Sequence, residues 1–470
     1  MLAEVMYQVA TADRALAHAT AALVDAGNDP SLRARALLTM AVLTADGETR
    51  AKHAEEAKRC LVEAQVTDPL LVGWATSEEV SARFHLGLGF DASAMDDALV
   101  IERTGREWRS GDQVAALRPV LLKWADHHTE ALASLEELRS RAELEGNEGL
   151  IPYVLGHIPG ILLRLGRFAE AAAAAAEHLS RSLAAGQDGQ HVQAVYNVAL
   201  VDAHLGNLDQ ANVGAHQILA WSEANSDTWI EMSACSVLGF AAQSGGDANG
   251  ARPWLDRWWR ASETLHVIDP GISRFHGDHI ESLIGAGVVD AATAQTEILE
   301  FRAERANRIS ALAVAARCRA LLAATAGDQR GALVHLDAAL AHHAACPIPF
   351  ETARTLMIRG TVHRRAKEKG AAKTYLERAR TAFDELGAAA FSARATAELD
   401  RLGTRPRSSL ELSATERRVA ELAAAGLTNR QVAERCFMSP KTVEANLVRI
   451  YRKLSIKSRA ELGARMVRNG

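Results

Sequence analysis

The stretch Gly206-Asn-Leu-Asp-Gln-Ala211 is one copy of a pattern that recurs along most of the chain, in which a turn residue is followed five positions later by Ala. Five consecutive copies have Gly as the turn residue, and these glycines are 40, 40, 41 and 40 residues apart. The other four cover residues 166–171, 246–251, 287–292 and 327–332. A constant period near 40 residues over most of a chain indicates a solenoid of stacked repeats.

Each repeat is predicted to contain two helices joined at the turn residue. An apolar helix such as 195–205 precedes the Gly, which ends it in the left-handed conformation. An amphipathic helix follows, as in residues 371–383, where apolar side chains recur at helical spacing. The frame continues outward with other turn residues, namely Asp46, Gly87, Asp126 and Lys367.

The period and the two-helix pattern of each repeat resemble a tetratricopeptide-like array with a lengthened repeat. Such arrays bury a continuous core and leave a concave surface for a partner. Residues 12–24 have the pattern of a second helix with only a stub before them, so we expect a natural form to extend further N-terminally. Five of the eight Trp lie between Trp221 and Trp259; we interpret them as repeat core, with an aromatic ligand patch as the alternative.

The net charge of −5 is unevenly distributed along the chain. Residues 408–470 carry 12 Lys and Arg but six Asp and Glu, a local charge of +6, so the rest of the chain carries −11. A basic module attracts phosphate groups, whereas an acidic body does not. We therefore look for a nucleic-acid interface in the last 60 or so residues.

Several other classes of protein do not fit the sequence. No run of 18 uncharged apolar residues predicts a membrane span, and the N-terminus lacks the basic start of a signal peptide. The five Cys are scattered and never spaced as Cys-x-x-Cys, which disfavours a disulfide framework or a zinc site and fits a reducing cytoplasm. We predict no catalytic residues, no metal site and no cofactor.

A small helical domain is predicted after a linker at residues 403–409, where Gly, Pro and Ser occur without an apolar period. Helix starts are marked by the capping boxes Ser413…Glu416, Thr428…Gln431 and Ser458…Glu461, and by Ser439-Pro440. Gly426 ends the first helix. The four expected helices cover about 414–425, 429–436, 440–454 and 459–468, and the short turn at 437–439 has the spacing of a helix-turn-helix.

The third of these helices has the composition of a recognition helix. At about 100° per residue, Val443, Leu447, Ile450 and Leu454 fall on one face and form its core side. The opposite face is basic and carries small uncharged side chains, which suits phosphates and base edges. It comprises Lys441, Ala445, Val448, Arg449 and Arg452.

Residues 412–416, 425–430 and 439–459, the last beginning Ser-Pro-Lys-Thr-Val-Glu, resemble the LuxR-type (GerE) DNA-binding domain. The resemblance covers about 410–468. It implies that Glu444, Ala445 and Val448 face bases, and that Thr428, Lys441, Thr442, Arg452 and Lys453 contact phosphates or lie beside residues that do. This chain departs from many members at Asn446, where they have His, and at Glu444, where they have Lys. Site preference therefore cannot be copied from relatives.

Helical repeats before such a domain resemble the C-terminal half of the large ATP-binding MalT-like LuxR regulators. Those place a P-loop ATPase module ahead of the repeats. No Gly-x-x-x-x-Gly-Lys-Ser/Thr motif occurs here. The segment Gly370-Ala-Ala-Lys-Thr374 lacks the first Gly and the preceding strand, and it falls on a predicted repeat helix. We do not expect ATP binding by this chain.

The sequence thus predicts an all-α protein: a tetratricopeptide-like solenoid at 1–402, a linker at 403–409 and a four-helix helix-turn-helix domain at 410–470. The predicted function is a cytoplasmic, sequence-specific transcriptional regulator, with activation as the preferred mode. Its expected partners are double-stranded DNA, a second copy of the chain on DNA, a protein or small-molecule effector on the repeats, and RNA polymerase. The alternatives are a protein-interaction scaffold with a vestigial DNA-binding domain and an ATP-dependent regulator whose nucleotide module lies outside this chain.

Overall fold

The computed structural model describes residues 12–272, 274–403, 412, 414–436, 438–454, 456 and 458–468. The chain divides into two compact units, Met1–Leu399 and Asp400–Gly470, which we name the repeat body and the C-terminal unit. Every regular element of the described residues is a helix, so the all-α class is confirmed. Among these residues, no helix is long and apolar enough to cross a membrane. Most of the predicted linker, residues 404–409, lies outside the described residues.

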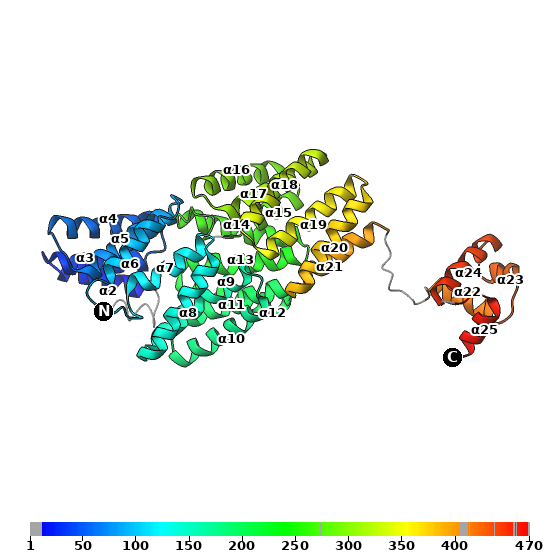
Figure 1. The fold of residues 1–470 in the computed structure, drawn as a ribbon, viewed down its shortest axis with the longest axis horizontal. Helices are drawn as coiled ribbons and strands as arrows, with labels where there is room; N and C mark the ends of the chain where they lie inside the picture. The colour runs from blue at the N-terminus through cyan, green and yellow to red at the C-terminus, as the bar shows by residue number, and fades with distance from the viewer. Residues whose placement is uncertain are drawn as a thin grey trace. The chain divides into compact units, whose positions relative to one another are not determined.

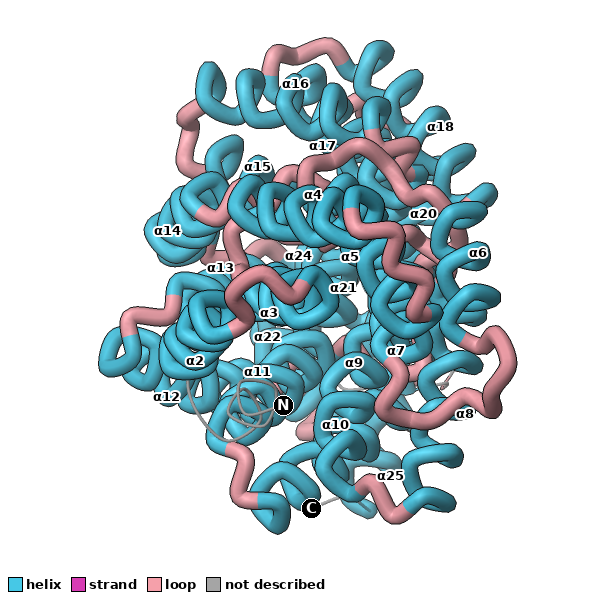
Figure 2. Tube along the Cα trace, turned by 90° about the vertical axis from the view of Figure 1, so that its left-hand side faces the viewer, coloured by secondary structure: helices cyan, strands magenta, loops and turns pink. Residues whose placement is uncertain are grey.

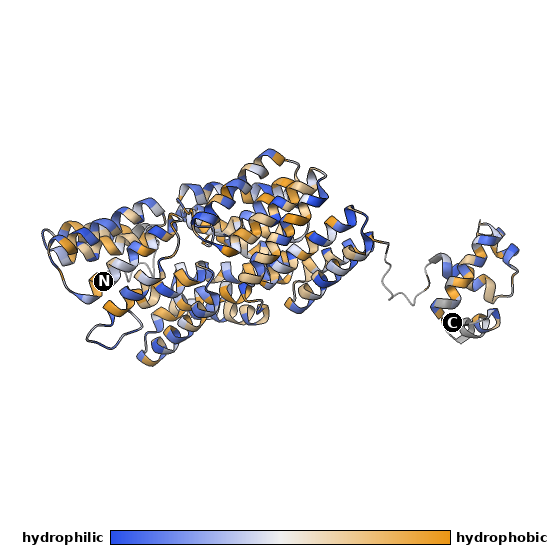
Figure 3. Cartoon of the chain, turned by 45° about the horizontal axis from the view of Figure 1, so that its top comes forward, coloured by the Kyte–Doolittle hydropathy of each residue, from blue (hydrophilic) through white to orange (hydrophobic). Residues whose placement is uncertain are grey.

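The repeat body is a succession of helices in which neighbours along the chain pack against one another (Figure 1). Figure 3 shows hydrophobic and hydrophilic residues alternating along most of them, as amphipathic helices require. The helices are α2 Ala12–Asp25, α3 Pro30–Leu43, α4 Gly47–Glu63, α5 Pro69–His85, α6 Ala92–Glu102, α7 Gln113–Trp124, α8 His128–Glu145, η1 Glu148–Leu150, α9 Ile151–Arg164, α10 Phe168–Ala185, α11 Asp188–Leu205, α12 Leu208–Asn225, α13 Thr228–Ser244, α14 Ala248–Thr264, α15 His276–Gly285, α16 Val289–Arg305, α17 Ile309–Thr325, α18 Gln329–Ala345, α19 Pro349–Arg365, α20 Lys369–Leu386 and α21 Ala389–Arg401.

The repeated Gly–Ala pattern marks the turns between paired helices, as predicted. The five repeat glycines have φ between +76° and +93°, the left-handed region in which a Cβ would be strained. The five Ala that follow them are all 0% exposed, because each lies where the second helix packs closely on the first. Asp126 and Lys367 also have positive φ. Asp46 differs: its φ is −72°, and its carboxylate instead caps α4 by accepting from the Thr49 backbone N–H.

Among the described residues, helices from distant repeats meet where the repeat pattern leads us to expect an open concave surface. The rings of Phe168 and Phe350 lie 5.8 Å apart, and those of Phe240 and Phe391 lie 6.3 Å apart. The Arg394 guanidinium also donates to the Gln243 carbonyl at 2.8 Å. The repeat pattern predicts which helices pair but carries no signal for how tightly the array winds. Figure 2 views the body end on, with α14, α16 and α18 toward its outside.

The tryptophan-rich stretch belongs mainly to the repeat core, as interpreted from the sequence. Trp258 is 1% exposed and is the largest fully buried side chain, while the other four in the stretch are half-buried. The P-loop-like segment at 370–374 lies within α20, as predicted.

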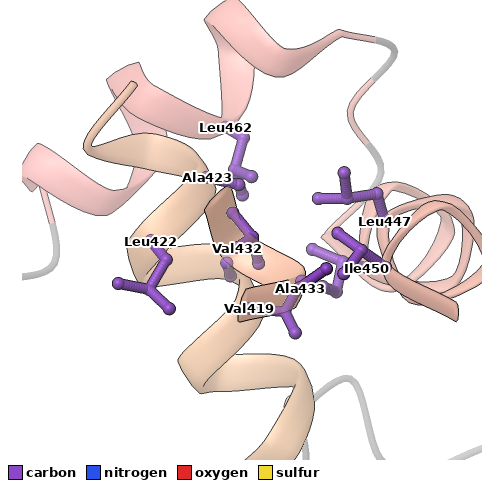
Figure 4. Packing of buried hydrophobic residues seen from close by; sticks show 10 residues of the cluster. Val419, Leu422, Ala423, Val432, Ala433, Leu447, Ile450 and Leu462 are labelled. Atoms are coloured by element: carbon purple, nitrogen blue, oxygen red, sulfur yellow. The ribbon is translucent and has the colours of Figure 1, made fainter. Parts of the chain in front are cut away.

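The C-terminal unit consists of α22 Ala414–Ala424, α23 Asn429–Cys436, α24 Pro440–Leu454 and α25 Arg459–Arg468. These bounds match the predicted helices to within one residue. Gly426, with φ +87°, ends the turn after α22. All four helices contribute to one small core (Figure 4), whose fully buried members include Val419, Val432, Ile450 and Leu462. This core holds α24 against α22 and α23 and leaves its other face outward.

Candidate nucleic-acid interface

The start of α24 is fixed by its own cap. The Thr442 backbone N–H donates to Ser439 Oγ at 3.1 Å, and the Ser439 and Thr442 hydroxyls are 2.8 Å apart. Pro440 follows the cap at the first helical position, where its missing N–H costs nothing. Together these residues define where the helix begins and therefore which residues occupy its first exposed turn.

The start of α23 is closed by the predicted capping box. The Thr428 backbone N–H donates to Gln431 Oε1 at 2.9 Å, and the Thr428 hydroxyl lies 3.0 Å from the same oxygen. Thr428 itself is exposed. The partial positive charge at a helix N-terminus attracts anions, so this exposed end is a reasonable place for a phosphate.

The two faces of α24 differ as the sequence predicted. Val443 and Ile450 are 0% exposed and Leu447 is 5% exposed, which confirms the core face. On the outward face Val448 is 67% exposed. Five of the predicted DNA-contacting residues are exposed together on this helix, namely Lys441, Thr442, Glu444, Ala445 and Val448. The side chains of Arg449 and Arg452 lie outside the described residues.

Lys453 occupies a different environment from the other predicted contact residues. Its ammonium group pairs with the carboxylate of Glu416 in α22, and the two side chains are only 18% and 4% exposed. From sequence, Glu416 was expected to cap α22 with Ser413, a residue outside the described ones. Since 37 residues separate Glu416 from Lys453, no local pattern could have indicated the pair.

Two polar residues position α23 and α24, and the predicted contact residues did not include them. Asn446, 6% exposed, donates from Nδ2 to the Thr442 carbonyl at 2.9 Å and lies against Met438 in the turn before α24. Arg459 at the start of α25 donates to Asn429 Oδ1 at 2.9 Å and to the Leu427 carbonyl. Asn446 therefore acts inward rather than toward DNA, and Arg459 ties α25 to the turn that carries Thr428.

Residues 410–466 match the family described as bacterial regulatory proteins, luxR family. They form a LuxR-family helix-turn-helix domain. Curated relatives in Mycobacterium bovis and in two strains of Mycobacterium tuberculosis, described as HTH-type transcriptional regulators, are 42% identical to this chain over 59 residues. The match covers 13% of this chain and 7% of each relative, so it concerns the DNA-binding domain alone.

Two solved structures resemble the chain at low identity. A tetratricopeptide repeat protein from Parabacteroides merdae is 16% identical, with a TM-score of 0.35 over 62% of this chain and 99% of that one. A Rap protein crystallised with Competence and Sporulation Factor is 13% identical, with a TM-score of 0.49 over 79% of this chain and 99% of that one.

Proposed function

We propose that this chain is a sequence-specific DNA-binding transcriptional regulator, with α24 as the helix that enters the major groove. The observation that supports this most directly is the outward face of α24, where the 67%-exposed Val448 lies among exposed polar and charged residues. An exposed apolar side chain beside Ala445 suits contact with thymine methyl groups. The match of residues 410–466 to a regulator family supports the same assignment.

Within this proposal the exposed residues divide into two groups. Glu444, Ala445 and Val448 face bases; the carboxylate of Glu444 is suited to accept from cytosine N4. Thr428, Lys441 and Thr442 contact phosphates, together with Arg449 and Arg452. Lys453 braces α24 through Glu416. In this proposal, any contact of Lys453 with DNA phosphates is secondary to its contact with Glu416.

A single domain of this size buries a small area on DNA, so useful affinity requires two half-sites and two copies of the chain. We propose that the regulator binds as a homodimer in the cytoplasm and activates transcription by contacting RNA polymerase. The repeat body then supplies regulation, by binding a protein or a small-molecule effector. No enzymatic activity is included in this proposal.

The test uses the full chain and a randomised duplex library. A regulator selects related sequences, and the logarithm of its affinity for them falls with the logarithm of salt by about 0.9 per phosphate contacted. Random duplexes bind more weakly at every salt concentration. Equal affinity for selected and random duplexes would instead favour a scaffold whose basic domain no longer reads sequence, and specific nucleotide binding would favour an ATP-dependent switch.

A further inference from the structure

One helix of the repeat body is shorter than its neighbours. α15 has 10 residues where α13 and α17 have 17, although the turn glycines on either side of it keep their spacing. An irregular segment that includes Asp269-Pro270-Gly271 precedes α15, where its neighbours have further helical turns. A proline and a glycine in sequence break the helix here. We name residues 265–272 and 274–275 the crossing segment.

The crossing segment is fixed in the interior of the repeat body. Asp269 is 0% exposed, pairs with Arg308 at 2.7 Å and accepts from the Gly271 backbone N–H at 2.7 Å. A Cβ added to Gly271 would lie 2.0 Å from the Trp124 carbonyl, so the segment packs directly on the end of α7. An irregular segment held this firmly can place a side chain precisely.

That side chain is Arg274, which the segment directs toward the inner face of α9. A Cβ added to Gly160 would lie 3.6 Å from a terminal nitrogen of Arg274, so the guanidinium lies over this glycine. His157, Gly160 and Arg164 are three and four residues apart and therefore share one face of α9. The absence of a side chain at Gly160 lets the guanidinium lie close to the helix.

A second cation, Lys123 of α7, lies beside the same face of α9. Its ammonium nitrogen is 3.0 Å from His157 Nδ1, and it lies 5.0 Å from the centre of the Trp124 ring. Burial first and then the neighbouring Arg274 lower the pKa of Lys123 to about 7. Burial and Arg164 likewise lower the pKa of Arg274 to about 10. The positive charge of Arg274 therefore disfavours the charged form of Lys123.

The carboxylates nearby are already engaged. Asp126 pairs with Arg164 at 3.2 Å and accepts from the Ser310 backbone N–H at 3.0 Å. Among the described residues, no carboxylate forms an ion pair with Lys123 or Arg274. The Arg274 side chain also forms no hydrogen bond with any described residue. Charges removed from bulk water are normally paired, because leaving one unpaired is unfavourable. Both residues nonetheless remain partly exposed.

We propose that Lys123 and Arg274 form a binding site for a small anion, one that carries a carboxylate or a phosphate group. The anion accepts hydrogen bonds from the guanidinium and the ammonium group. It adds to the negative charge of Asp126 and Glu351, which act on Arg274 but form their ion pairs with other arginines. The half-buried Tyr196 of α11 interacts electrostatically with Arg274. Calling this anion an effector rests on the proposed regulatory role of the repeat body; the binding itself does not depend on DNA.

The site is tested by calorimetric titration of the full chain, without DNA, with inorganic phosphate and separately with succinate at constant ionic strength set by sodium chloride. We expect one equivalent of at least one of these anions to bind, and to bind at least tenfold more weakly to Arg274→Gln and to Lys123→Met. Arg330→Gln on α18, an exposed arginine outside the site, is the matched control and leaves binding unchanged. The anion that binds more tightly identifies the group that the site prefers.

A second measurement separates a binding site from a structural role. In chloride alone, Arg274→Gln melts at the same or a higher temperature than the unmodified chain, because removing one cation relieves repulsion. The added anion then raises the melting temperature of the unmodified chain more than that of the variant. The proposal is overturned if Arg274→Gln binds the anions as well as the unmodified chain does, as it would if phosphate bound only the basic C-terminal unit. It is also overturned if Arg274→Gln lowers the melting temperature in chloride. DNA binding by the same variants reports on the proposed regulator function separately.

Discussion

Lys453, near the end of α24, is joined by an ion pair to Glu416, near the start of α22. Both side chains are largely shielded, at 18% and 4% exposed. A shielded pair of this kind contributes little net stability when intact, but removing one partner leaves a charge without compensation. The pair therefore fixes how α24 lies on the core of the C-terminal unit, and the angle of the outward face depends on it.

We expect Lys453→Met to destabilise the C-terminal unit by about 1–3 kcal/mol, because the buried carboxylate of Glu416 loses its ion pair with Lys453. Hydrogen exchange of the α24 backbone amides measures this, since the unit contains no Trp. Lys441→Met is the control: its side chain is exposed, so exchange stays unchanged while affinity for DNA falls. If Lys453→Met weakened DNA binding without faster exchange, Lys453 would be a phosphate contact rather than a brace.

Arg459→Gln should loosen the turn between α22 and α23. The substitution removes the hydrogen bonds to Asn429 Oδ1 and to the Leu427 carbonyl, which hold this turn against α25. We expect faster exchange at the first amides of α23 and a uniform, several-fold loss of affinity on all duplexes, since Thr428 is then less well placed. Arg430→Gln serves as the control because Arg430 is exposed on α23, the helix whose first amides are measured. Unchanged exchange near Thr428 in Arg459→Gln would refute the positioning role.

The sequence predicted the elements of both units because their ends are encoded locally. Gly426 and the Thr428–Gln431 box fix helix ends through contacts within a few residues, and the repeat glycines do the same in the body. Helical periodicity likewise separated the buried Val443 from the exposed Val448. Each of these signals requires only the backbone geometry of a single helix or turn.

What the sequence did not predict depends on contacts between distant residues. The Glu416–Lys453 pair spans 37 residues. The Phe168–Phe350 contact, which helps to fill the expected concave surface, joins residues 182 positions apart. The sequence marks Asn446 only as a departure from relatives, although its side chain faces inward and donates to the Thr442 carbonyl. These positions follow from how helices wind and pack, which a repeat period does not specify.

The stability of the repeat body should fall steeply below about pH 6.5. Burial, and then a neighbouring arginine, lowers the pKa of His85 and of His276 to about 3, whereas the ordinary value is 6.5. Between these values the unfolded chain binds protons that the folded chain does not, so acid favours unfolding. Each such His contributes up to about 1.4 kcal/mol per pH unit in this window.

The measurement is the urea midpoint between pH 7.5 and 4.5, followed by tryptophan fluorescence, because all eight Trp lie in the repeat body. His276→Gln should make the urea midpoint depend less steeply on pH, whatever the substitution does to the midpoint at pH 7.5. The exposed His18 provides the control, and His18→Gln should keep the original slope. Identical slopes for His276→Gln and the unmodified chain would show that His276 is not the group responsible.

The last prediction concerns the outward face of α24. Val448 carries no charge and is 67% exposed, so within the proposed interface it can act only through shape and contact with base methyl groups. Lys441 is an exposed cation at the start of the helix, and Arg452 lies three turns further along on the same face. We therefore expect Val448 to determine which sequences are preferred, and the two cations to determine affinity for any duplex.

Val448→Ala should change the ranking of sites in a randomised library by about 1–3 kcal/mol for each altered base contact. Lys441→Ala and Arg452→Ala should weaken all duplexes about equally and reduce the slope of log affinity against log salt by about one unit each. Arg418→Ala is the control, because Arg418 is exposed on α22 and not on α24. In the opposite pattern, Arg452→Ala would reorder the sites and Val448→Ala would preserve their order. That result would mean that α24 enters the groove with another face or does not enter it. An uncharged side chain that faces the bases must affect sequence preference, because it has no charge with which to bind phosphates.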